Sequence, residues 1–151
     1  MKYLCVDACY LIALYDPTDQ HHTEAERSFK SLFESSANQF VVVWPILYET
    51  LSTRMARHSG RVDSIRRDFT IFAATNRLQR LDDSPYRDGS MTEFFDETVR
   101  SPSSYRALSL ADRVVRRVLA DVNVKTDALV TFNVGDFADV CAKRRIEILP
   151  Q

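Results

Sequence analysis

Runs rich in β-branched residues alternate along this chain with segments whose apolar residues recur every three or four positions, and this alternation restricts the fold more than any other feature. The expected strands are residues 2–6, 40–44, 78–81, 128–132 and 146–149. Helical spacing lies between them, and parallel strands need helical crossovers to join them. The sequence therefore predicts an α/β fold, a three-layer α/β/α sandwich with a mainly parallel central sheet.

The expected helices differ in how clearly their ends are marked. Apolar spacing predicts helices at residues 8–14, 23–36, 62–74 and 136–143, and a further helix after Pro45 that carries Ile46, Leu47, Leu51 and Met55. Gly60 is expected to separate this last helix from the one at 62–74. Ser109 and Asp112 match a capping box, which opens a helix whose apolar face is Val114, Val115, Val118 and Leu119.

Residues 82–109 are the hardest part of the chain to interpret. Ser, Pro and Gly interrupt them repeatedly, which is typical of loops, and only residues 91–99 suggest a helix. Aromatic and basic side chains here could stack on bases and hold phosphates of RNA, although they also suit an ordinary solvated surface; they are Tyr86, Arg87, Arg100, Tyr105 and Arg106.

Composition limits the class of protein. A chain of 151 residues with 45% hydrophobic content can bury one substantial core, so one domain over residues 1–151 is expected. The net charge of -1 means that any nucleic-acid recognition has to come from a local site. Cys5, Cys9 and Cys141 form no zinc-binding pattern and are expected to be buried thiols. No apolar run is long enough to span a membrane, and Asp7 and Asp16 interrupt the apolar opening, so we expect a cytoplasmic protein.

Acidic residues recur at the junctions between the expected elements. Asp7 ends the first strand, Glu49 lies one turn into a helix, Asp112 lies in the first turn of another, and Asn133 and Asp136 follow the strand at 128–132. In parallel sheets such junctions share one edge. Carboxylates gathered there suit Mg²⁺-assisted phosphodiester hydrolysis, because hard cations prefer oxygen ligands and offset the mutual repulsion of the acids.

Each acid by itself also suits a purely structural role. Asp7, Asp112 and Asp136 stand where a side chain caps the following helix. Glu49 alone would be a helix acid beside an apolar face. The functional interpretation therefore depends on all of them meeting in one place.

The order of these motifs resembles the PIN-domain ribonucleases, in particular the VapC-like toxins, over nearly the whole chain. Residues 3–14 (YLCVDACYLIAL) are similar to the family's strand, aspartate and helix opening. Residues 43–49 (VWPILYE) and 108–112 (LSLAD) are similar to its second and third acidic motifs. Residues 128–137 (ALVTFNVGDF) resemble its T-x-N/D-x-x-D-F signature, and residues 146–150 (IEILP) its closing strand.

The resemblance implies a PIN-like fold and a Mg²⁺- or Mn²⁺-dependent endoribonuclease that hydrolyses RNA phosphodiester bonds. Asp7, Glu49 and Asp112 would be the metal-binding acids. The fourth member would be Asn133, which could offer a neutral oxygen or orient water where some relatives carry aspartate, or Asp136 acting through water. An asparagine in place of an acid implies weaker metal binding and favours one-metal occupancy.

Supporting residues and partners also follow from the resemblance. Thr131 would hydrogen-bond near the site, and Ser109 would support Asp112 through the helix cap. The family further implies a homodimer that sets two acidic grooves beside one RNA path, and a small antitoxin protein that blocks the site.

Two other classes of function stay open at this point. A catalytically degenerate PIN-like module that binds RNA or a protein partner is compatible with Asn133. A flavodoxin-like or receiver-like phosphotransfer domain also places acids at strand ends, but it needs a lysine near its phosphoacceptor. The few lysines are poorly placed for that role; they are Lys2, Lys30, Lys125 and Lys143.

Overall fold

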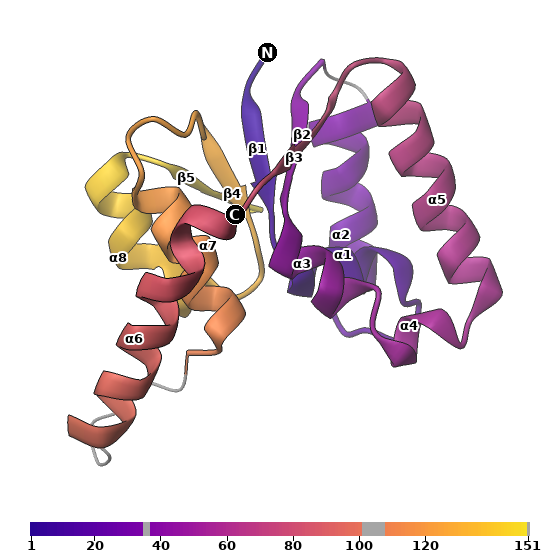
Figure 1. Ribbon diagram of the computed structural model, residues 1–151. Helices are drawn as coiled ribbons and strands as arrows, with labels where there is room; N and C mark the ends of the chain where they lie inside the picture. The colour runs from indigo at the N-terminus through magenta and orange to yellow at the C-terminus, as the bar shows by residue number, and fades with distance from the viewer. Residues whose placement is uncertain (35–36, 101–107, 151) are drawn as a thin grey trace.

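The computed structural model describes residues 1–34, 37–100 and 108–150 (Figure 1). Within them a five-stranded sheet has the order β3-β2-β1-β4-β5, and every neighbouring pair is parallel. The strands are β1 (Tyr3–Val6), β2 (Gln39–Val43), β3 (Leu78–Leu81), β4 (Ala128–Val130) and β5 (Glu147–Leu149). The predicted sheet is therefore confirmed, and β1 occupies its centre.

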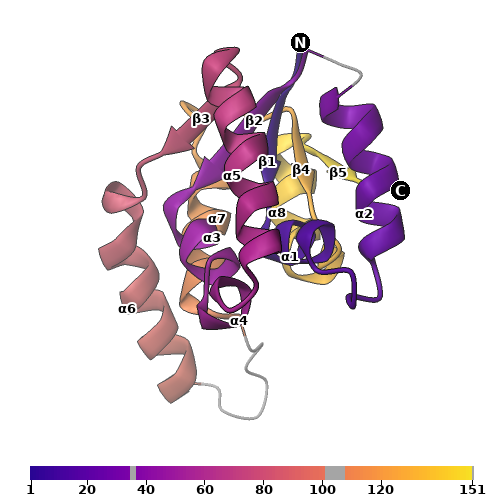
Figure 2. The same ribbon diagram turned by 90° about the vertical axis from the view of Figure 1, so that its right-hand side faces the viewer.

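Helices cover both faces of this sheet, as Figures 1 and 2 show from two directions. One face is covered by α1 (Ala8–Tyr15), α2 (His22–Phe29) with its π-helical continuation η1 (Lys30–Glu34), and α5 (Ser59–Ala74). The other face is covered by α7 (Leu110–Ala120) and α8 (Val134–Arg144). The short helices α3 (Trp44–Thr50) and α4 (Thr53–Ala56) follow β2 at the carboxyl-terminal end of the sheet.

The central strands are buried on both faces, which is why they are apolar without alternation. All of Leu4 to Val6, Val41 to Val43 and Ala128 to Val130 are at most 1% exposed. Four phenylalanines, Phe29, Phe33, Phe40 and Phe72, pack edge-on or stacked between α2, η1, β2 and α5, with ring centroids 4.9–6.0 Å apart. Ring pairs of this kind add roughly 0.5–1.5 kcal/mol each beyond the area that they bury, so they hold α5 to the sheet.

The expectation of a single helix after Pro45 is wrong, because two short helices follow, α3 and α4. Leu51 is the C-cap of α3, and Ser52 is the N-cap of α4. Leu51 was expected on the buried face and is 46% exposed, whereas Met55 is buried as expected. Gly60 does not separate two helices either, since it lies in the first turn of α5.

The expectation of loops over residues 82–109 is also wrong for its first half, where α6 (Ser84–Arg100) is continuous. The carboxylate of Asp82 accepts hydrogen bonds from the amide and hydroxyl of Ser84, 3.1 and 2.7 Å away, and so starts the helix. Gly89 lies inside α6, where the side chain of Arg117 approaches the helix backbone closely: a Cβ at Gly89 would be 2.9 Å from Arg117 Nη1. Arg117 donates instead to the Gly89 carbonyl at 3.0 Å.

A buried arginine fastens α6 to α7. The side chain of Arg113 is fully buried and donates to Glu93 at 3.0 Å and to Glu97 at 2.7 Å. Its guanidinium also lies over the ring of Phe94, 5.7 Å from the ring centroid. These contacts hold α6 where it projects past the rest of the molecule in both views (Figures 1 and 2). The propensity of Ser, Pro and Gly for loops is overridden by this tertiary pairing.

Two expectations from composition can be compared with the structure. Cys5 and Cys141 are buried free thiols, as predicted, but Cys9 is only partly buried. Along the described ranges, no helix combines the length and the apolar character needed to cross a bilayer.

Candidate active site

Three of the predicted acids come from different elements at the carboxyl-terminal end of the sheet. Asp7 follows β1 directly, Glu49 lies on α3 just after β2, and Asp112 lies in the first turn of α7. The charge of Asp112 contributes to a raised pKa of Asp7, and the charges of Asp112 and Asp7 contribute to a raised pKa of Glu49. The sheet therefore brings these three carboxylates into one electrostatic neighbourhood.

Asp7 is held in place by three hydrogen-bond donors. It is 4% exposed and caps α1, because its Oδ1 accepts from the amide of Ala8 at 2.8 Å. Its Oδ2 accepts from the hydroxyl of Thr131 at 2.7 Å and from the thiol of Cys9 at 3.0 Å. Burial raises the pKa of Asp7, and these hydrogen bonds partly oppose that rise because they stabilise the charged form. The cap predicted for Asp7 is real, and it coexists with the place of Asp7 among the acids.

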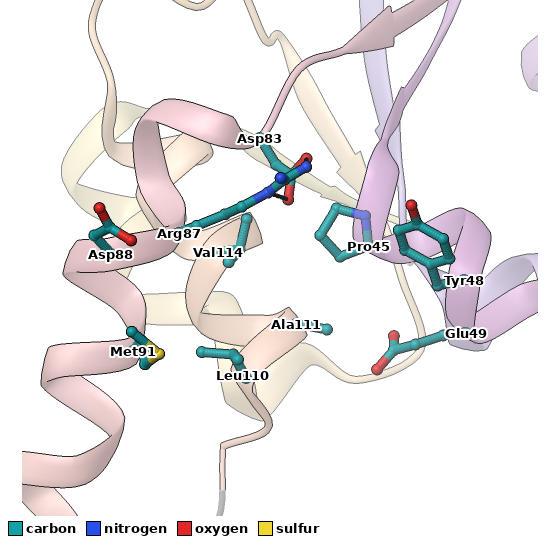
Figure 3. Close-up of a pocket in the computed structure, with 10 residues that line it drawn as sticks. All are labelled: Pro45, Tyr48, Glu49, Asp83, Arg87, Asp88, Met91, Leu110, Ala111 and Val114. Carbon is teal, nitrogen blue, oxygen red and sulfur yellow. Dashed lines mark hydrogen bonds and ion pairs between the residues drawn. The ribbon is translucent and has the colours of Figure 1, made fainter.

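Glu49 has the clearest sign of electrostatic strain. Desolvation, followed by the charges of Asp112 and Asp7, raises its pKa from 4.5 to about 7. Figure 3 shows its half-buried carboxylate reaching from α3 toward the beginning of α7. A carboxylate that is destabilised by two neighbouring carboxylates is a group that a bound cation would stabilise.

Asp112 forms the predicted capping box with Ser109. The Ser109 hydroxyl accepts from the Asp112 amide at 3.0 Å, and Asp112 Oδ2 accepts from the Ser109 amide at 3.1 Å and from its hydroxyl at 2.8 Å. The cap uses only Oδ2, so it fixes the carboxylate without engaging Oδ1. Structural and functional roles of Asp112 are thus compatible.

Asn133 and Asp136 bind each other. The Asn133 side-chain amide donates to Asp136 Oδ2, and Arg116 donates to the backbone carbonyl of Asp136. The Asn133 amide N–H also donates to the Thr131 hydroxyl at 2.9 Å, which links this pair to Asp7 through Thr131. Thr131 is 1% exposed, so it connects the end of β4 to the buried Asp7.

The donors present are of the kind that Mg²⁺ and Mn²⁺ select, since all are carboxylate or amide oxygens. Asp7, Glu49 and Asp112 offer the charge, and the pKa of Glu49 is raised first by burial and then by the charges of Asp112 and Asp7. Within the described residues, however, no three His, Cys, Asp or Glu side chains already stand close enough together to hold an ion. The chemistry of the donor set fits a divalent cation, and the three carboxylates would have to close around it.

Sequence reasoning missed two features of this region. Cys9, expected to be a buried thiol, is partly exposed and contacts Asp7, the hydroxyl of Thr131 at 3.2 Å and the amide of Phe132 at 3.4 Å. Its position two residues after Asp7 on the first turn of α1 was the available signal. The second feature is an apolar cavity between α3, α6 and α7, which borders Glu49 (Figure 3).

Of the aromatic and basic residues expected to contact RNA, Tyr86 and Arg87 have partners within the protein. Arg87 forms a bidentate ion pair with Asp83, with distances of 2.9 and 2.7 Å, so its charge is largely compensated. The hydroxyl of Tyr86 donates to Asp121 at 2.8 Å. Tyr105 and Arg106 lie outside the described residues, as does the side chain of Arg100.

Comparison with solved structures identifies the fold. The chain matches VapC20 of Mycobacterium tuberculosis, described as a sarcin–ricin loop cleaving toxin, with a TM-score of 0.59 and 17% identity over 90% of this chain and 94% of that one. It matches VapBC2 from Rickettsia felis, solved bound to a DNA fragment from its promoter, with a TM-score of 0.55 and 13% identity over 97% of both chains. No protein-family model and no curated protein matches the sequence.

The fold is therefore that of a PIN domain, an all-parallel five-stranded sheet flanked by helices. More particularly, it is the fold of the VapC toxins, shared over 90–97% of this chain. The resemblance stated from the motifs is confirmed at the level of structure.

Proposed function

We propose that the protein is a Mg²⁺- or Mn²⁺-dependent endoribonuclease that hydrolyses RNA phosphodiester bonds, and that it is the toxin of a toxin–antitoxin pair. The observation that carries this proposal is the placement of Asp7, Glu49 and Asp112 at the carboxyl-terminal end of the sheet, where the charge of Asp112 raises the pKa of both Asp7 and Glu49. The VapC fold supports it, since one of the similar structures is described as a toxin that cleaves the sarcin–ricin loop. An RNA substrate, a homodimer, a small antitoxin and a cytoplasmic location belong to the same proposal.

Each residue has a definite task in this scheme. Asp7, Glu49 and Asp112 would hold the cation, which when bound supplies charge compensation for the phosphate and activation of water. Thr131 and Cys9 keep Asp7 oriented through its Oδ2. Asp112 is kept in place by its cap, as described above.

The fourth position belongs to the pair Asn133 and Asp136. The side-chain amide of Asn133 donates a hydrogen bond to Asp136, so the two side chains would contribute to the site as a pair, with Asp136 acting through water. Ser109 supports Asp112 in the same way that Thr131 supports Asp7, with one hydroxyl on one carboxylate oxygen.

The direct test is cleavage of RNA by variants that remove one charge each. Asp7→Asn and Asp112→Asn should abolish Mg²⁺- or Mn²⁺-dependent cleavage while circular dichroism stays unchanged. The control is Asp63→Asn, which alters only an exposed pair with Arg66 and should cleave as the parent does. Full activity in both site variants would remove the proposed mechanism.

A non-catalytic module that binds RNA or a protein is the second candidate. It is favoured by Asn133, a neutral amide at the fourth position of the group, and by the separation of the acids noted above. Calorimetry distinguishes the two functions: binding of Mn²⁺ at millimolar concentrations, lost in Asp7→Asn, supports the nuclease, and no binding by the parent supports the module.

A further inference from the structure

An apolar cavity of about 330 Å³ lies directly beside the acidic site, between α3, α6 and α7 (Figure 3). Its volume is at the small end of ordinary ligand pockets, which span roughly 300–1,000 Å³. Pro45, Tyr48, Met91, Leu110 and Val114 form most of its walls. Glu49 belongs both to this wall and to the group of acids, so the cavity and the acidic site share a border.

Exposed apolar side chains gather around this cavity. Tyr48, the residue before Glu49, is 71% exposed, and Met91 and Leu110 are 45% and 43% exposed. The ring of Trp44, itself 39% exposed, is tilted against the ring of Tyr48, with a centroid distance of 6.1 Å and an interplanar angle of 34°. Such a contiguous set of exposed apolar groups beside a polar site marks a binding surface.

The charges of the described residues that line the cavity disfavour a phosphate as its occupant. Within that described lining, Glu49, Asp83 and Asp88 contribute three carboxylates, and the one cation, Arg87, is already paired with Asp83. A neutral flat ring meets none of this repulsion, and its face can stack on Tyr48. In RNA the group of this character near a scissile phosphate is the base of the adjoining nucleotide, which the ribose links to that phosphate.

We propose that this cavity binds the unstacked nucleobase next to the scissile phosphate, with the ring of Tyr48 as its stacking surface. The proposal rests on the proposed nuclease function and names its substrate class: RNA in a single-stranded segment or loop, because a base there leaves its stack at less cost than a base inside a helix. Arg87, held by Asp83, then forms the far wall that limits how deep the base enters.

The test measures RNA binding in a cleavage-deficient Asp7→Asn background without divalent metal, using an unstructured eight-nucleotide RNA of mixed sequence. Adding Tyr48→Ala should weaken binding roughly 5- to 150-fold, the range for loss of one base–aromatic stack. Tyr48→Phe keeps the ring face and should bind as the background protein does. Phe95→Ala is the matched control, because Phe95 is 59% exposed on α6 and does not line the cavity.

A second set of RNAs makes the test specific to one base. Octamers with a single abasic position, moved along the strand, should show one position at which loss of the base weakens binding as much as Tyr48→Ala does. The two losses should not add when combined, because the base and the ring form one contact.

The outcomes separate this proposal from the function on which it rests. Absence of Mg²⁺- or Mn²⁺-dependent cleavage by the parent protein overturns the nuclease function. Cleavage by the parent together with unchanged RNA binding in Tyr48→Ala overturns only the nucleobase site. Normal RNA binding by Tyr48→Ala together with loss of a co-expressed protein partner would assign the cavity to that partner and would equally overturn it.

Discussion

Replacing Glu49 by glutamine should stabilise the metal-free protein at alkaline pH. Glu49 is a carboxyl group whose pKa rises from 4.5 in the unfolded chain to about 7 in the folded one. Between these values the folded protein binds the proton more tightly than the unfolded chain does, so stability falls as pH rises from about 4.5 to about 7. Above that range the charged Glu49 is a destabilising group, and a neutral glutamine of the same shape removes the penalty.

The size of the effect follows from the same shift. A tenfold change in proton affinity corresponds to about 1.36 kcal/mol, which gives an upper bound of about 3 kcal/mol for Glu49. Because the side chain is only half-buried and water screens part of its field, the expected gain is about 1–2 kcal/mol. For a chain of this length that gain raises Tm by roughly 2–8 °C.

The assay compares thermal melts of the parent and Glu49→Gln at pH 5 and pH 8, in buffer with a chelator. Glu49→Gln should melt higher at pH 8 and close to the parent at pH 5, where Glu49 is protonated. Glu34→Gln is the control, since Glu34 is exposed at the end of η1. Millimolar Mn²⁺ should raise the Tm of the parent at pH 8 more than that of Glu49→Gln.

Two results would refute this reasoning. An equal Tm for parent and Glu49→Gln at pH 8 would show that the neighbouring acids do not strain Glu49. A gain of the same size at pH 5 and pH 8 would show that the stabilisation comes from packing rather than from charge.

Two further predictions concern residues that act through their contacts. Arg113→Ala should lower the free energy of unfolding, measured in urea, by about 2–3 kcal/mol, because it removes the buried guanidinium that pairs with Glu93 and Glu97. Arg66→Ala is the control, since it removes only an exposed ion pair worth under about 1 kcal/mol, and an equally small loss in Arg113→Ala would contradict the anchoring role of Arg113. Cys9→Ala should reduce metal-dependent cleavage about fivefold through loss of one hydrogen bond to Asp7, and Cys9→Ser should restore it; equal rates in both variants would show that the thiol does not position Asp7.

The order of strands and helices could be predicted where local pattern and tertiary role agree. β1 and α1 are found within a residue of their expected bounds, because an apolar run, an aspartate and a second apolar run encode a strand, a cap and a helix. The capping box at Ser109 was equally readable, since it depends on residues three positions apart. Interactions of this kind, between residues close together in the sequence, can be predicted from the sequence alone.

The missed features depend on contacts between distant segments. α6 contains Pro85 and Gly89, which argue against a helix locally, and it is held by Arg113 and Arg117 from α7. The cavity beside Glu49 could not be predicted either, because Tyr48, Met91 and Leu110 are isolated apolar residues until α3, α6 and α7 meet. The places of Asp7 and Glu49 after strands and of Asp112 at the start of a helix could be predicted from local motifs, whereas the spacing of the three carboxylates in the folded chain could not.

The central position of β1 has a consequence for the time at which the acidic site forms during synthesis. Asp7 leaves the ribosome more than a hundred residues before Asp112 and Thr131, which complete its surroundings. At roughly 5–20 residues per second, this delay lasts about 5–25 seconds. Throughout that interval the nascent polypeptide carries the first acid without its partners, so an abandoned translation product that stops before β4 cannot have the assembled centre.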